Sequence, residues 1–147
     1  MEITRQIFDI LQSITIVVTT IFTGWWTYKT FAHKEKIADL KNILVTIEEI
    51  KFEVRTLGAI PELVELVQSR EKFLDLSIAL DQSVKSSLYI ATKDRNTLSD
   101  FAENIMATYR NVILEKDKTK KEFDIRRCAD LCKEMNGNIV QIAKKYT

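Results

Sequence analysis

The residues that most clearly suggest a binding chemistry are basic side chains gathered between positions 110 and 127. The segment RNVILEKDKTKKEFDIRR holds seven Lys or Arg residues against four Asp or Glu residues. Arg forms paired hydrogen bonds with phosphate and Lys acts as a point charge, while the neighbouring Tyr109 offers a ring for base stacking. We therefore predict an anion-binding site formed by Arg110, Lys116, Lys118, Lys120, Lys121, Arg126 and Arg127.

Two other interpretations of the basic residues stay open. Acidic residues interleave with the segment, so it could instead be an ordinary solvated face; these residues are Glu115, Asp117, Glu122 and Asp124. A second anion-binding candidate is the pair Lys93 and Arg95, at a junction between two predicted helices. The formal net charge of the chain is only +1, so we expect no binding of duplex nucleic acid.

Cys128 and Cys132 lie one helical turn apart, and they are the two cysteines of the chain. A metal site would need two more ligands, and the single histidine, His33, lies about a hundred residues away. We expect both cysteines to be reduced and buried as small apolar side chains. The sequence also lacks a Gly-rich phosphate loop and a G-x-S-x-G motif. We therefore predict no catalytic site, no metal site and no enzyme activity.

The element closest to the N-terminus is an uncharged stretch of nineteen residues between Asp9 and Lys29, ILQSITIVVTTIFTGWWTY. A helix needs about 20 apolar residues to cross the hydrocarbon layer of a membrane. Trp25, Trp26 and Tyr28 cluster at its end and Lys29 follows, which is typical of a membrane–water interface. We predict a short external tail over residues 1–9, a transmembrane helix over 10–31 and a cytosolic domain over 32–147.

A buried or surface-lying helix and a cleaved signal peptide are the alternatives to this span. The tail holds one Arg against two acidic residues and the stretch does not end in small residues, which disfavours a signal peptide. Arg5 precedes the span, whereas four lysines follow it: Lys29, Lys34, Lys36 and Lys41. The positive-inside rule then places the N-terminus outside and the domain in the cytoplasm. In a bacterial host this is a single-pass inner-membrane protein in contact with lipid.

Threonines recur at every fourth position of the span, at Thr15, Thr19, Thr23 and Thr27, and Thr20 and Gly24 form a small pair beside them. Small and hydroxyl-bearing residues let membrane helices approach closely. We predict that these six residues form a self-association face. Two alternatives remain: the hydroxyls bond to carbonyls of their own helix, or the stripe lines a narrow polar path between several copies.

The rest of the chain is predicted to be helical, because the whole sequence holds only three Gly and one Pro. Apolar residues recurring by three and four predict an all-α fold, an antiparallel bundle of about four helices after the transmembrane helix. The expected helices cover residues 34–57, 61–93, 97–115 and 121–146, the third with a capping pattern from Thr97 to Asp100. The first has a broad apolar stripe that packs on its own bundle or on copies, and we expect the bundle to oligomerise.

A span from Ile10 to Tyr28 with a WWTYK exit leads into a helical remainder that ends at Thr147. This layout resembles the small membrane effectors of bacterial antiviral defence. More narrowly, it is similar to the cyclic-tetra-adenylate-responsive membrane effector of type III CRISPR systems. The resemblance implies a homo-oligomer, a tetramer, which binds a cyclic oligoadenylate and then permeabilises or depolarises the inner membrane. It carries over no ligand-binding residue.

The sequence as a whole predicts a membrane-anchored oligomeric sensor and effector that binds an anionic ligand, with a cyclic oligonucleotide implied by the resemblance. One alternative is a membrane-tethered helical scaffold or interaction protein. Another is a phage-encoded lysis or exclusion factor that acts on the membrane without a ligand.

Overall fold

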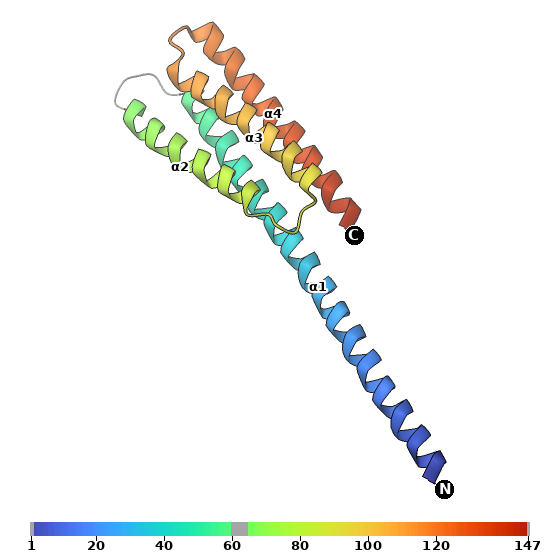
Figure 1. Ribbon diagram of the computed structural model, residues 1–147. Helices are drawn as coiled ribbons and strands as arrows, with labels where there is room; N and C mark the ends of the chain where they lie inside the picture. The colour runs from blue at the N-terminus through green and yellow to red at the C-terminus, as the bar shows by residue number, and fades with distance from the viewer. Residues whose placement is uncertain (1, 60–64, 147) are drawn as a thin grey trace. The chain divides into compact units, whose positions relative to one another are not determined.

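The computed structural model describes the backbone of residues 2–59 and 65–146, and side chains over residues 3–57 and 69–146. Four helices account for nearly all of it: α1 (Glu2–Ala59), α2 (Glu65–Lys85), α3 (Thr92–Leu114) and α4 (Lys118–Tyr146) (Figure 1). The prediction of an all-α fold is confirmed for these residues. The chain divides into two compact units, residues 1–35 and residues 36–147, and each is described by itself.

The first unit is the N-terminal part of α1. This helix contains one stretch that is long and apolar enough to cross a membrane, and none of that stretch is buried. Its large side chains are correspondingly exposed, including Phe22, Trp25 and Trp26 at 60%, 53% and 59%. A contiguous apolar surface of this kind is unusual for a protein in water and is typical of surfaces that lipid or another protein covers.

The second unit is a four-helix bundle formed by α1 from Lys36 onward together with α2, α3 and α4. Successive helices run antiparallel, and each contacts its neighbour along the chain (Figure 1). Individual contacts illustrate this packing. Glu53 with Lys72 joins α1 to α2, Phe73 with Tyr109 joins α2 to α3, Ile105 with Cys128 joins α3 to α4, and Tyr146 with Lys36 joins α4 to α1. The last of these contacts joins α4 to α1 and so closes the bundle.

The core of the bundle is built from the apolar faces that the sequence predicts for α1, α3 and α4. The broad stripe of α1 is buried inside its own bundle, at Leu40, Ile43, Ile47, Ile50 and Val54. The same holds on α4 for the residues at three- and four-residue spacing, Cys128, Cys132, Met135, Ile139 and Ile142. The stripe therefore packs on its own bundle, and copies are not needed to cover it.

The predicted end of the second helix at residue 93 is wrong, because α2 ends at Lys85. Serine side chains compete for the last carbonyls of this helix: the hydroxyls of Ser87 and Ser86 both donate to the Ser83 carbonyl, at 2.7 and 3.4 Å. Such local bonds favour turns over continued helix. The predicted start of this helix at residue 61 lies outside the described residues.

The third helix begins at Thr92, before the predicted start at residue 97. Lys93 and Arg95 are therefore helical, where the sequence predicts a polar turn. Thr97 does not cap the helix, because its hydroxyl donates to the Lys93 carbonyl at 3.1 Å inside it. Ile90 is buried and fixes the chain just before this point, so the helix starts as soon as the turn is complete.

The fourth helix begins at Lys118, three residues before the predicted start. The carboxylate of Asp117 accepts hydrogen bonds from the N–H groups of Thr119 and Lys120, at 2.9 and 3.4 Å. This is N-capping, which stabilises the first turn. The helix continues through Gly137, as expected from the sequence.

Candidate functional site

The predicted basic site lies where α3 ends and α4 begins. Arg110 lies four residues before the end of α3, Lys116 is in the connection, and the other five residues belong to the first three turns of α4. All are exposed except Lys121, which is half-buried. The fold therefore brings the seven residues to one end of the bundle, where α3 connects to α4.

Phe123 stands in the middle of this region and is 64% exposed. Lys120, Arg126 and Arg127 lie three or four residues from it along α4, so they share its face of the helix. None of these three cations lies in an ion pair within the described residues. We name these four residues the basic patch. An exposed ring beside unpaired cations can stack a base and bind its phosphate.

The sequence prediction chose Tyr109 as the stacking ring, and the structure contradicts this. Tyr109 is 1% exposed and packs edge-on against Phe73, with ring centroids 5.0 Å apart. Burial also raises the pKa of its phenol. Phe123 takes the exposed position instead. Its signal was present in the sequence as a lone aromatic among charged residues.

Two of the interleaved acidic residues hold the backbone of this corner. The Glu115 carboxylate accepts hydrogen bonds from the N–H groups of Lys116 and Asp117, both at 3.0 Å, and Asp117 caps α4 as described above. Carboxylates used in this way shape the connection and do not pair with the cations of the basic patch. The interpretation of an ordinary solvated face is weakened, although Glu122 is still exposed nearby.

Lys93 and Arg95 lie at the start of α3, and the basic patch lies beyond its end. The 23 residues of α3 span about 34 Å at 1.5 Å per residue. The two predicted anion-binding candidates are therefore separate surfaces at opposite ends of the bundle. Lys93 is exposed and Arg95 is half-buried.

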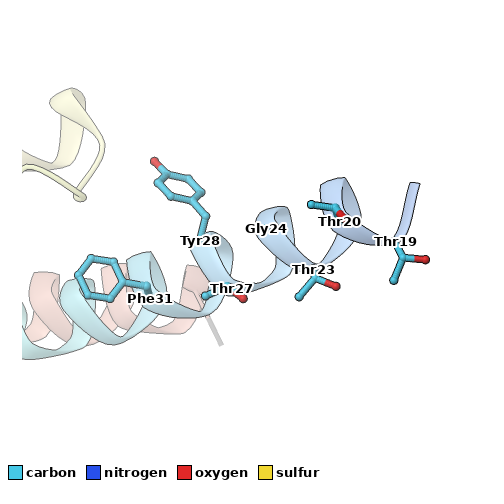
Figure 2. Close-up of a pocket in the computed structure, with 7 residues that line it drawn as sticks. All are labelled: Thr19, Thr20, Thr23, Gly24, Thr27, Tyr28 and Phe31. Carbon is cyan, nitrogen blue, oxygen red and sulfur yellow. The ribbon is translucent and has the colours of Figure 1, made fainter. Parts of the chain in front are cut away.

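The threonine face of the first unit lines a shallow open groove along α1. Figure 2 shows its residues, Thr19, Thr20, Thr23, Gly24, Thr27, Tyr28 and Phe31. The hydroxyls of Thr15, Thr19 and Thr20 donate to the carbonyls four residues earlier, at 2.8, 2.7 and 2.8 Å. One predicted alternative, bonding within the helix, is therefore observed at these three positions. Because these hydroxyls already donate to backbone carbonyls, they are better suited to close packing between helices than to lining a polar path.

Gly24 leaves this groove open, because a Cβ atom added there would meet no atom within 4 Å. A second helix could approach the backbone closely at this point. Self-association of the span stays a prediction.

The aromatic residues at the end of the span form a cluster with a lysine. The Phe22 ring lies 6.1 Å from Trp25 and 6.3 Å from Trp26, and the Lys29 ammonium lies 5.1 Å from the Trp25 ring centroid. A cation over an aromatic ring is favourable, and rings followed by lysines suit the membrane–water interface. Two of the residues predicted for this interface, Trp25 and Lys29, thus contact each other.

A groove between α1 and α2 was not predicted from the sequence. Its apolar part is Val45 and Phe52, which are 59% and 67% exposed, and its rim carries Glu48, Glu49 and Glu53. We name these five residues the acidic groove. Across it, Glu53 pairs with Lys72 at 2.7 Å, and this hydrogen bond raises the pKa of Lys72. Val45 and Phe52 lie seven residues apart, on the side of α1 away from its buried stripe.

Comparison with protein-family models, with curated proteins and with solved structures found no match.

The two cysteines are buried and free, at 0% and 1% exposed. The prediction for them is confirmed. A hydrogen bond with Cys132 and, to a smaller extent, burial raise the pKa of Cys128, which keeps this thiol protonated and unreactive. Over the described parts of the chain, no three His, Cys, Asp or Glu residues are grouped closely enough to hold a metal ion.

Proposed function

We propose that this protein is a single-pass membrane protein whose helical bundle binds an anionic ligand at the basic patch. The observation that carries the proposal is the exposed Phe123 ring with Lys120, Arg126 and Arg127 on the same face and without ion-pair partners in the described chain. A ring and three cations match a ligand that has both a flat base and a phosphate. The protein acts as a sensor and not as an enzyme.

The output of this sensor is the membrane segment of α1. Its apolar stretch is unburied, and an aromatic cluster with Lys29 follows, which supports a span with the N-terminus outside and the bundle in the cytoplasm. In a bacterium this is the inner membrane. Copies associate through the threonine face, and the ligand shifts the assembly by its different affinity for the two states.

A narrower form of the proposal follows from the layout alone. The protein is an antiviral effector, its ligand is a cyclic oligoadenylate, and its assembly is a tetramer that permeabilises or depolarises the membrane. The resemblance described above supports this form.

The test is the thermal stability of the full chain in detergent with cyclic tetra-adenylate, smaller cyclic nucleotides and linear oligoadenylate. We expect one of these ligands to raise the melting temperature. Arg126→Glu with Arg127→Glu should abolish the shift. Lys133→Glu, an exposed change on the same helix outside the patch, should keep it. The proposal fails if no ligand shifts the protein or if both variants respond like the wild type.

The second candidate function is a membrane-tethered interaction protein, and the acidic groove favours it. Val45 and Phe52 are exposed above three carboxylates, which suits an apolar and basic partner segment. A partner that co-purifies in stoichiometric amount, and is lost in Phe52→Glu but retained in Arg126→Glu, would favour this function. Toxicity of the full chain without any added ligand would instead favour the lysis or exclusion factor.

A further inference from the structure

The connection between α2 and α3, residues 86–91, presents an apolar side chain that the bundle does not use. Leu88 is 76% exposed, more than any other large apolar side chain in the described residues. Its neighbours hold the turn in place: Ser87 and Ile90 are 0% and 2% exposed, and the Leu88 N–H donates to the Ser86 carbonyl at 2.8 Å. The fold therefore sets the outward position of Leu88.

Contacts place this connection at the end of the bundle where the chain enters from the first unit. The Ala91 N–H donates to the Tyr146 hydroxyl at 3.5 Å, and the Lys36 ammonium lies 4.1 Å from the Tyr146 ring centroid. Residue 36 is the first residue of the bundle. The α2–α3 connection and the C-terminal end of α4 lie together at this end (Figure 1).

The length of chain between the span and the bundle limits how far this end can lie from the membrane. Lys36 follows Tyr28, the last aromatic residue of the exit, by eight residues. That is about 12 Å as helix and at most about 29 Å fully extended. With the span in a bilayer, this length of chain keeps the end that carries Leu88 within reach of the lipid headgroups.

The charge at this end suits an anionic surface. Residues 36–41, 81–95 and 144–146 hold seven Lys or Arg residues and three Asp residues. Two of the three carboxylates pair with lysines of the same end, Asp81 with Lys85 at 2.8 Å and Asp94 with Lys145 at 3.1 Å. The surface is thus net positive, and anionic lipids attract basic residues close to the membrane.

We propose that the α2–α3 connection is a second membrane contact, in which Leu88 enters the headgroup region of an anionic leaflet while Lys93 and Arg95 meet lipid phosphates. An exposed apolar side chain flanked by basic residues is the pattern of interfacial attachment. This inference rests on the proposed membrane attachment, and it gives the second anion-binding candidate a lipid phosphate as its ligand. It also holds the entry end of the bundle against the membrane that the span crosses.

The test places a nitroxide label on full-length protein in nanodiscs, at Leu88→Cys or at the control Leu114→Cys. Leu114 is also exposed, at 57%, and ends α3 at the other end of the bundle. The native cysteines are buried, so the label reacts at the introduced position. Accessibility to oxygen, which is enriched in lipid, is compared with accessibility to a water-soluble nickel complex. Phosphatidylcholine discs with and without phosphatidylglycerol supply the two surfaces.

We expect the label at position 88 to become several-fold less accessible to nickel, and more accessible to oxygen, when phosphatidylglycerol is present. The label at position 114 should stay water-accessible in both discs. Lys93→Glu with Arg95→Glu should return the position 88 label to water, and Lys133→Glu should not.

Two results would overturn the contact while leaving the span intact: water accessibility equal to that at position 114 in anionic discs, or shielding from both reagents in every lipid, which indicates a second copy. Protein that does not enter the discs at all would contradict the span as well.

Discussion

The side chains of the basic patch and of the core respond differently to change because they differ in exposure. Phe123 is 64% exposed on α4, whereas Tyr109 is 1% exposed between α2 and α4. An exposed side chain contributes little to the stability of the bundle, so its type can serve binding. The buried phenol of Tyr109 is part of the core, and burial makes its ionisation unfavourable in the folded state.

Phe123→Ala should weaken ligand binding and leave the bundle stable. Loss of a stacking ring costs about 1–3 kcal/mol of binding free energy per base. Loss of an exposed side chain changes the free energy of unfolding by about 0.5 kcal/mol or less. Calorimetric titration with the nucleotide that shifts the wild type, beside a urea unfolding curve, measures both. Leu114→Ala is the matched control, and equal affinity of all three proteins would remove Phe123 from the site.

Alkaline pH should destabilise the bundle through Tyr109. Its pKa is raised by burial, so the folded state holds its proton more tightly than the unfolded state. The stabilisation is complete below the unfolded pKa of about 10 and falls as the pH rises above it. Lys72 acts in the same direction, because its hydrogen bond with Glu53 raises its pKa.

Urea midpoints of the full chain in detergent at about pH 8 and about pH 11 measure this loss. Tyr109→Phe should show a smaller difference between the two midpoints than the wild type. An equal or larger difference would show that Tyr109 is not responsible.

At the scale of the helices, two features lead to testable predictions: the groove of α1 in the first unit and the capped start of α4. Gly24 leaves α1 open to close approach by another helix. Asp117 fixes the first turn of α4, which contains Lys120 and precedes Phe123. Each can be tested by a single substitution.

Gly24→Ile should reduce self-association of the full chain in detergent. A Cβ atom added there meets no side chain within 4 Å, so the position is open, but a branched side chain would block a partner backbone. We expect a loss of about 0.6–2 kcal/mol in the free energy of association, measured by light scattering over a dilution series. Val18→Ile changes an exposed residue on the opposite side of the helix and serves as control. Unchanged association in Gly24→Ile would exclude this face.

Asp117→Ala should lower the free energy of unfolding of the bundle by about 0.5–2 kcal/mol, the cost of losing an N-cap. Glu122→Ala, in the same turn region but without a capping bond in the described structure, should have a smaller effect. Urea unfolding followed by circular dichroism compares them. Equal effects of the two substitutions would show that the cap does not hold α4.

The helices could be predicted from the sequence where apolar residues repeat without interruption, and less well where tertiary contacts decide. The rows that contain Ile43, Ile50 and Ile139 gave the buried faces of α1 and α4, because burial follows helical periodicity. The end of α2 depends on serine hydroxyls and on burial of Ile90 in the core of the bundle, which no local pattern contains.

The candidate site could be predicted only in part for the same reason. The basic residues of positions 110–127 were identified by composition, since charged side chains stay at the surface. Tyr109 was expected to offer an exposed ring and is buried instead, because which aromatic ring is buried depends on the packing of α3 against α2. The acidic groove was missed because its five residues lie on the side of α1 away from the buried stripe, and only the fold places Lys72 of α2 against Glu53.

For the whole molecule, the central claim is a membrane span followed by a cytoplasmic bundle. The unburied apolar stretch of α1, the aromatic cluster with Lys29 and the lysines that follow it all support that order. The buried stripe of α1 gives the second unit a core of its own, so no copy is needed to complete that core. The proposed ligand binding, assembly and lipid contact of Leu88 each depend on this arrangement.

Protease protection of the full chain in bacterial membranes tests this claim most directly. After an alkaline carbonate wash the chain should stay in the membrane pellet. Protease should remove the bundle from inverted inner-membrane vesicles and leave it intact in spheroplasts. A chain released by carbonate, or a bundle digested in intact spheroplasts, would contradict the account.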